Sequence, residues 1–488
     1  MQILALDFGT TSARGILYGS GGRALDMHSV STPLQIDRDT GYIEQSPVAF
    51  QGALMEICAA IAARNRVDAL SLTAFRSAPT LVDRNGEALT NFIMWQDTRN
   101  SDICRRLEPT SGEIYRRSGA RLNTVFTASK LTWLKENVPE LWRRAFKAMV
   151  VPDYLLHCLT GSFATDLTYG SRTHLMDIQK LCWDEELVRL FGLDMDKLCE
   201  LRGQGTVFGG VTEAFAARTG LKAGTPVVSA GGDQQCGALG LGVLDGSSIE
   251  VNSGTGSFVI SLTDRPLLEN EAVITNVAAV PGMYTQEMNI IASASALNWL
   301  IREFFPEYWG DAPDFEAVNR LAAQTPPGSH GLCAVPLLQG CGSRDWNPEA
   351  RAIFAGFSLN SKRSDLPRAL YEGIAAEIAK SIDALPESCR QAGYIDVAGG
   401  LSRADVYCRI LADMTGRTLR RGDSAQATAL GAYISAAVAL GEYVDYRAAF
   451  KAVRGSGQAD VFAPDPETAE FYQGYKERTE RLYRAERG

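Results

Sequence analysis

At 488 residues the chain is longer than one hydrophobic core usually supports, so two domains of roughly 200 to 250 residues are expected. Its formal charge of −9 and pI near 5.2 argue against a protein that binds nucleic acid or an anionic membrane. The ten cysteines form no C-x-x-C pair, no charged leader precedes the first apolar run, and no apolar run reaches about 18 residues. We therefore predict a cytoplasmic protein.

The chain opens with an apolar run at residues 3–8, a Gly/Thr/Ser turn, and a second apolar run at residues 15–18. This pattern predicts a buried strand hairpin with a polar turn. The other elements predicted in this half are strands at 23–30, 67–74, 80–83 and 226–230, and helices at 48–64, 130–137, 153–159 and 236–242. Because strands and helices alternate, the fold class is predicted to be α/β.

Residues 248–260 repeat the opening layout of strand, Gly/Thr turn and strand about 245 residues later, which is what a duplicated domain would produce. The further elements predicted are helices at 293–305, 367–382, 404–414 and 425–440, a strand and loop at 336–342, a strand at 395–398 and a terminal helix beyond 466. Ser424 is the predicted N-cap of the helix at 425–440.

Several catalytic motifs are absent from the sequence. It contains no G-x-x-x-x-G-K-[ST], no G-x-G-x-x-G after a strand, no G-x-S-x-G and no H-E-x-x-H, and none of its four histidines lies in a glycine turn. These absences disfavour a P-loop NTPase, a nicotinamide dehydrogenase and a serine hydrolase.

Three glycine and hydroxyl turns remain, each at the end of a predicted strand, at residues 7–12, 252–257 and 399–402. Backbone amides and threonine hydroxyls can hold polyphosphate oxygens when Mg²⁺ neutralises the remaining charge. Asp7 is the acid placed for that metal, although such turns also form for purely local reasons. Asp233, at a strand-to-helix junction, is either an N-cap or a general base for a substrate hydroxyl.

A dozen short motifs, in order along nearly the whole chain, resemble those of the FGGY family of carbohydrate kinases. They are LALDFGTTSAR at 4–14, MWQDTR at 94–99, SKLTWL at 129–134, LTG and TD within 159–166, AGGDQQ at 230–235, NSGTGSF at 252–258, GSRDWNPEAR at 342–351, F-x-G at 354–356, RALYEG at 368–373, AGGLSR at 398–403, LADMTG at 411–416 and ALGAY at 429–433.

The resemblance implies two actin-like, ribonuclease H-like domains, at residues 1–245 and 246–488, with ATP and a sugar in the cleft between them. The first would carry the sugar site and catalytic base, and the second much of the nucleotide site. The implied roles are Asp233 as the base, Asp7 on the metal side, and the nucleotide-binding residues Thr10, Thr11, Arg14, Gly254, Thr255, Gly399 and Gly400. The implied cofactors are ATP and Mg²⁺, and a homodimer is a possible assembly.

Substrate-binding roles are implied for Arg76, Trp95, Asp233 and Gln234. Arg76 could instead be a surface ion-pairing arginine, and Trp95 a core aromatic. Kinases similar to glycerol kinase carry an acid where this chain has Ser77.

Val125 stands where those kinases have a substrate tyrosine, and Ala294 where a nucleotide-side glycine is common. An unpaired polyol hydroxyl costs roughly 1 to 3 kcal/mol. The prediction is therefore a kinase of a small sugar or polyol, with a ketopentose such as xylulose favoured over glycerol or another polyol. A nucleotide-operated binding module like actin or Hsp70 is the distant alternative.

Overall fold

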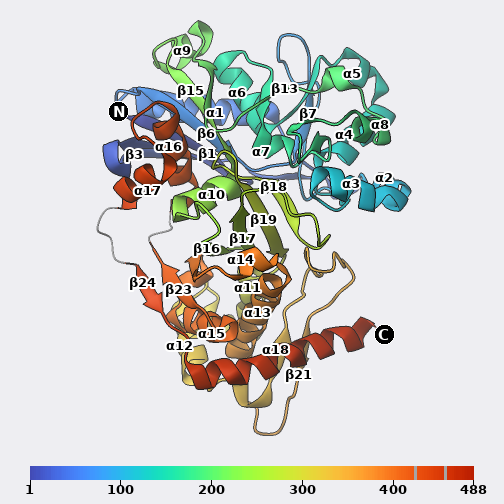
Figure 1. Cartoon of the computed structure of the whole chain (residues 1–488), viewed down its shortest axis with the longest axis vertical. Coiled ribbons are helices and arrows are strands. Elements are labelled where there is room, and N and C mark those ends of the chain that lie inside the picture. The colour runs from blue at the N-terminus through green and yellow to red at the C-terminus, as the bar shows by residue number, and fades with distance from the viewer. Residues whose placement is uncertain (423–425, 455–458, 488) are drawn as a thin grey trace.

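The computed structural model describes residues 1–422, 426–454 and 459–487. Two large sheets, each covered by helices, make up most of the molecule, one in the upper part and one in the lower part of Figure 1. The α/β class predicted from the sequence is confirmed. No helix within the described ranges combines the length and apolar character needed to cross a bilayer.

The first sheet has six strands in the order β14-β15-β6-β1-β2-β3. Their bounds are β1 Ile3–Phe8, β2 Ser12–Gly19, β3 Arg23–Ser31, β6 Ala69–Ala74, β14 Thr206–Gly210 and β15 Pro226–Gly232. Strand β6 runs parallel to both β1 and β15. The carboxyl ends of β1, β6 and β15 therefore meet at one edge of the sheet.

Alternating side chains of β1 enter two different cores, because successive residues of a strand point to opposite faces. Leu4 and Leu6 pack with the helices α1 (Pro47–Ala62) and α6 (Val151–Thr160). Ile3 and Ala5 pack instead with α10 (Asp233–Leu241) and α16 (Ala427–Ala439). The strand is thus covered on both faces, as its continuous apolar sequence predicts.

The second sheet has seven strands in the order β18-β19-β17-β16-β22-β23-β24. Their bounds are β16 Ser248–Ser253, β17 Ser257–Thr263, β18 Ile274–Val277, β19 Tyr284–Ile290, β22 Tyr394–Ala398, β23 Thr418–Arg421 and β24 Asp460–Phe462. The helices α11 (Ala294–Phe304), α12 (Phe315–Gln324), α13 (Asp365–Ala384), α15 (Asp405–Thr415) and α18 (Pro466–Arg487) share its core.

The rest of the chain forms smaller units. Short strands are β4 Gln35–Ile36, β5 Ile43–Gln45, β7 Pro79–Val82, β8 Phe92–Ile93, β9 Lys147–Val150, β10 Ala164–Asp166, β11 Met176–Asp177, β12 Cys182–Trp183, β13 Glu200–Arg202, β20 Cys333–Val335 and β21 Ile353–Ala355. Further helices are α2 Ser101–Leu107, α3 Ser111–Ser118, α4 Thr127–Asn137, α5 Pro139–Arg144, α7 Leu167–Gly170, α8 Glu185–Leu190, α9 Glu213–Thr219, α14 Glu387–Arg390 and α17 Tyr446–Arg454.

Helices α16 and α17 lie beside the first sheet, although they come late in the chain (Figure 1). Helices α10 and α16 cross so closely that a Cβ on Gly240 would collide with the carbonyl of Ala427, and one on Gly431 with that of Cys236. Only glycine allows two helix backbones to approach this far. On its other side Ala238 of α10 packs with β17, so α10 connects the two sheets.

Most predicted elements are confirmed to within a few residues, including the hairpin β1–β2 and the helix α6 with a left-handed Gly161 at its C-terminus. Of the strand and loop predicted at 336–342, the strand is wrong, because β20 is Cys333–Val335 and ends before Pro336. Proline has no N–H to donate to a partner strand. The predicted N-cap, Ser424, lies outside the described residues.

Candidate active site

Three predicted site segments meet where β1, β6 and β15 end. Phe8 and Gly232 are both in register with Ala74, so the turn after β1, the residues after β6 and Asp233 after β15 share one sheet edge. Ligands of open α/β sheets bind at the carboxyl ends of the strands. The register therefore places Asp7, Arg76 and Asp233 in one neighbourhood.

Asp233 is the first residue of α10, and the N-cap position belongs to Gly232. Its Oδ1 accepts the backbone N–H of Gln234 at 2.8 Å, and the Nε of Arg76 lies 3.4 Å from the same oxygen. Burial raises the pKa of Asp233 even though the Arg76 charge opposes the shift. The N-cap interpretation is wrong, and a carboxylate with a raised pKa suits general-base chemistry.

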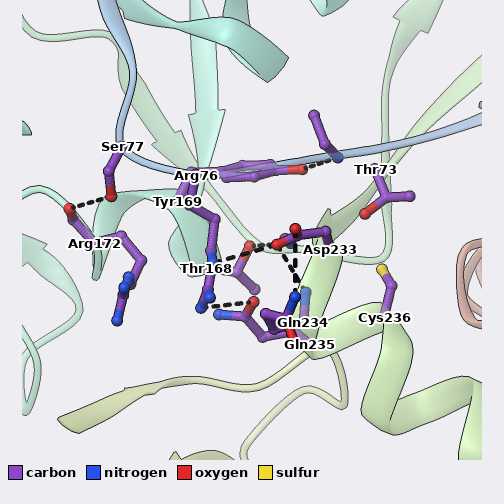
Figure 2. A network of polar contacts seen from close by, with 12 residues as sticks. Thr73, Arg76, Ser77, Thr168, Tyr169, Arg172, Asp233, Gln234, Gln235 and Cys236 are labelled. Carbon is purple, nitrogen blue, oxygen red and sulfur yellow. Dashed lines mark hydrogen bonds and ion pairs between the residues drawn. The ribbon is translucent and has the colours of Figure 1, made fainter. Parts of the chain in front are cut away.

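A buried hydrogen-bond network fixes the backbone just before Asp233 (Figure 2). The carbonyl of Gly231 accepts the hydroxyls of Tyr169 and Thr73, each at 2.8 Å. The N–H of Gly232 donates to the Thr168 hydroxyl at 2.9 Å. These contacts hold the start of α10, and with it the Asp233 carboxylate, in a defined position.

Arg76 is buried, with 8% of its surface exposed, so it is not a surface arginine. Its Nη1 lies 3.0 Å from Oε2 of Glu287, which comes from β19 of the second sheet. Burial by itself would lower the pKa of Arg76, but the carboxylates of Glu287 and Asp233 raise it above its ordinary value. Arg76 thus joins Asp233, at the edge of the first sheet, to Glu287 on the second sheet.

Sequence reasoning missed Glu287 and Arg172, whose Nη1 lies 3.5 Å from Oε1 of Glu287. Burial by itself would raise the pKa of Glu287, but Arg76 and Arg172 hold it below the ordinary value. A charged residue within the otherwise uncharged strand Tyr284–Ile290 was the signal that could have identified this acid.

Replacing Glu287 by Gln is expected to lower the melting temperature and to lower kcat/KM by roughly tenfold or more, because a buried arginine loses its counter-charge. Thermal unfolding and steady-state kinetics would measure both effects. Glu250→Gln is the matched control. Glu250 pairs with Ile260, which pairs with Glu287, so the two acids lie on the same face of the sheet. Burial raises the pKa of Glu250 to about 8, so Glu250 is mostly protonated at neutral pH. Equal behaviour of the two variants would contradict the role assigned to Glu287.

The turn after β1 brings together Thr10, Thr11 and Trp95. The Trp95 Nε1–H donates to Oγ1 of Thr10 at 3.2 Å, and Gln45 donates to the Thr10 carbonyl at 2.7 Å. The carbonyl of Thr11 accepts the N–H of Thr32. Trp95 is 38% exposed, so the core-aromatic interpretation is wrong. A partly exposed aromatic ring of this kind can contact a small molecule.

Asp7 lies at the end of β1, with Arg14 Nε 3.6 Å from its Oδ2. Burial raises the pKa of Asp7 to about 6, Arg14 lowers it and Asp233 adds to the rise. The described residues contain no group of three His, Cys, Asp or Glu side chains arranged to hold a metal. Mg²⁺ commonly uses one or two carboxylates with waters and phosphates, so Asp7 fits that mode of binding.

The second sheet assembles the other predicted turns. Because β16 and β22 are parallel, with Asn252 in register with Ala398, Gly399 lies against Ser253. Gly399 has φ +87°, and a Cβ there would collide with the Ser253 backbone. Gly400 faces open space, with nothing within 4 Å of a built Cβ. These features fit a nucleotide lying close to the backbone.

The start of α11 closes the turn that contains Gly254 and Thr255. The carbonyl of Thr255 accepts the N–H groups of Ser293 and Ser295, and that of Gly254 accepts the N–H of Ala294. The predicted residues thus form two groups, one on each sheet. Among the described residues, no hydrogen bond or ion pair joins these two turns to the residues predicted at the first sheet.

Two family models together match most of the chain. The model of the N-terminal domain of the FGGY family of carbohydrate kinases matches residues 2–240, and that of its C-terminal domain matches residues 250–440. The chain belongs to the FGGY family. It is therefore a phosphotransferase acting on a hydroxyl group of a sugar or polyol, and its two sheets with their helices are the two actin-like, ribonuclease H-like domains.

Individual relatives differ in substrate. A glycerol kinase from Thermococcus kodakarensis is 30% identical, over 98% of this chain and 96% of its own. A xylulose kinase from Staphylococcus epidermidis is 28% identical, over 99% of this chain and 96% of its own. The solved structure of a ligand-bound xylulose kinase from Lactobacillus acidophilus has a TM-score of 0.93 at 23% identity, covering 99% of this FGGY kinase and 98% of that chain.

Proposed function

We propose that this FGGY kinase transfers the γ-phosphoryl group of MgATP to a hydroxyl of a ketopentose such as xylulose. The observation that carries the catalytic assignment is Asp233, a half-buried carboxylate that has a raised pKa and lies 3.4 Å from Arg76 at the sheet edge shared with Asp7. In this scheme Asp233 accepts the hydroxyl proton as the oxygen–phosphorus bond forms and the bond from the γ-phosphorus to ADP breaks.

The proposed binding roles follow the two groups of residues. Thr10, Thr11 and Arg14 on the first sheet, and Gly254, Thr255, Gly399 and Gly400 on the second, bind the nucleotide. Asp7 acts through Mg²⁺. Arg76, Trp95 and Gln234 bind the sugar, and the Gln234 amide lies 3.5 Å from Oδ2 of Asp233.

Two residues near the predicted sugar-binding residues favour a ketopentose over glycerol. Ser77 supplies no carboxylate, and its hydroxyl donates to the carbonyl of Arg172 at 3.3 Å. Val125 packs against an apolar cluster of Ala120, Phe126 and Ile274 and supplies no hydroxyl. Glycerol or another polyol stays the second candidate, because Arg76 is retained and several relatives are glycerol kinases.

A coupled assay of ADP release, run with ketoses, aldoses, sugar acids and polyols of three to six carbons, tests the proposal. We expect the largest kcat/KM with a five-carbon ketose. A larger value with glycerol would favour the second candidate. No substrate-stimulated ADP release with any compound would contradict the assigned activity.

A further inference from the structure

Lys130 is a buried lysine in the first turn of α4, where its positive charge is disfavoured. Its exposed fraction is 0%, and burial lowers the pKa of its ammonium group to about 7, although Asp97 opposes the shift. The N-terminal end of a helix carries a partial positive charge, so a cation at this position is disfavoured for a second reason. Residues that break such local rules are often found at functional sites.

The partners of Lys130 lie in the turn just before its own helix, at residues 123–126. The Lys130 Nζ donates to the carbonyl of Thr124 and, at 2.9 Å, to that of Val125. The Nδ2 group of Asn100 donates to the same Thr124 carbonyl at 3.0 Å. Two fully buried side chains therefore fix the backbone of the 123–126 turn.

The 123–126 turn lies close to the segment that carries Arg76. The ring of Phe126, the last residue of the turn, has its centre 4.6 Å from the guanidinium carbon of Arg172. The carbonyl of Arg172 accepts the Ser77 hydroxyl at 3.3 Å, and Ser77 directly follows Arg76 (Figure 2). The turn is therefore connected through Arg172 to the segment of a predicted sugar-binding residue.

A second contact connects the turn to the segment that carries Trp95, another predicted sugar-binding residue. Asn100, which donates to the turn, ends the short segment MWQDTRN that contains Trp95. Residues 123–125 are partly exposed, whereas Phe126 and Lys130 are buried. One side of the turn is thus accessible from solvent, and its other side is held by Lys130.

We propose that Lys130 is a positioning residue for the sugar: it holds the 123–126 turn in a fixed place relative to Trp95 and Arg76, and the sugar contacts the exposed side of that turn. This inference rests on the proposed kinase function, but not on which sugar is the substrate. An ammonium group has three donors, so one side chain can satisfy two adjacent carbonyls. Without these bonds, the two carbonyls would reorient toward water and displace the turn.

Lys130→Met tests this role, because Met keeps an unbranched apolar side chain and removes both donors. Xylulose is the probe, or glycerol if the substrate screen shows that glycerol is preferred. We expect KM for the probe to rise roughly tenfold or more, since small displacements of positioning groups have large effects. KM for ATP should stay within about threefold. Calorimetry with a non-hydrolysable ATP analogue present would give Kd for the probe without turnover.

A purely structural role for Lys130 predicts a different pattern. Thermal unfolding of Lys130→Met would then show a lower melting temperature, while KM for the probe in the folded protein stayed within about threefold of the parent value. That result would overturn the inference, and so would an equal rise in KM for the probe and for ATP.

Lys147→Met is the matched control. The Nζ of Lys147 also donates to two backbone carbonyls, those of Asp196 at 2.8 Å and Leu198 at 2.7 Å, in a loop that carries none of the predicted site residues. This variant should keep both KM values within about threefold. An equal rise in KM for the probe in Lys147→Met and Lys130→Met would contradict a specific role for Lys130.

If Lys130→Met does not fold, Asn100→Ala decides, because it removes a donor to the Thr124 carbonyl without removing a charge. KM for the probe should then rise at least about threefold with KM for ATP unchanged, and an unchanged KM for the probe would overturn the inference. If no compound stimulates ADP release by the parent protein, the proposed function fails instead. An active parent protein whose variants keep the parent KM contradicts only the role of Lys130.

Discussion

Replacement of Asp233 by Asn is expected to lower kcat by roughly 10²- to 10⁴-fold, the contribution typical of a general base. Asn keeps the size of the side chain and can still accept the Gln234 N–H that Asp233 accepts at 2.8 Å. It cannot take up the substrate proton. Binding of ATP should stay within about threefold, because the predicted nucleotide turns lie elsewhere.

Single-turnover kinetics and calorimetry with ATP would separate these effects for Asp233→Asn. Asp153→Asn is a matched control, because Asp153 is another aspartate whose pKa is raised by burial, here to about 8, so it is mostly protonated at neutral pH. The control should keep its turnover. If Asp233→Asn turned over within tenfold of the parent protein, Asp233 would not be the base.

Asp7→Asn is expected to abolish Mg²⁺-dependent turnover without lowering the stability of the metal-free protein at pH 7.5. Burial raises the pKa of Asp7 from 3.8 to about 6, so ionising it opposes folding. This cost is absent below about pH 4, grows as the pH rises to 6 and is complete above that. Asn removes this cost, which is of order 3 kcal/mol for a shift of about two pKa units and already includes the favourable effect of Arg14.

Thermal unfolding from pH 4 to 8, with and without Mg²⁺ and ATP, would measure the effect of Asp7→Asn. The variant should be more stable than the parent protein at pH 7.5, and this difference in stability should shrink as the pH falls. Mg²⁺ with ATP should stabilise the parent protein more than the variant. Equal stabilisation of both proteins, together with retained activity, would contradict a metal role for Asp7.

Most helices and strands could be predicted from the sequence, because the patterns that indicate them lie within a few adjacent residues. The apolar run of β1, the turn glycines and the left-handed Gly161 each reflect the conformation of a few adjacent residues. The packing of α16 against the first sheet was not predictable, since no short-range pattern says which sheet a helix of small residues will cover. The cytoplasmic location, the homodimer, the domain boundary at residue 245 and the roles of the site residues stay predictions.

The sequence by itself determined the class of chemistry, because the glycine and hydroxyl turns and their order along the chain are properties of short segments. Only the tertiary structure decided which charges meet. Arg76 and Glu287 are 211 residues apart in the chain and 3.0 Å apart in space, and Arg172 completes that group. Burial and pairing of charges depend on packing between the two sheets, which no local pattern contains, so this group of charges could be identified only in the folded protein.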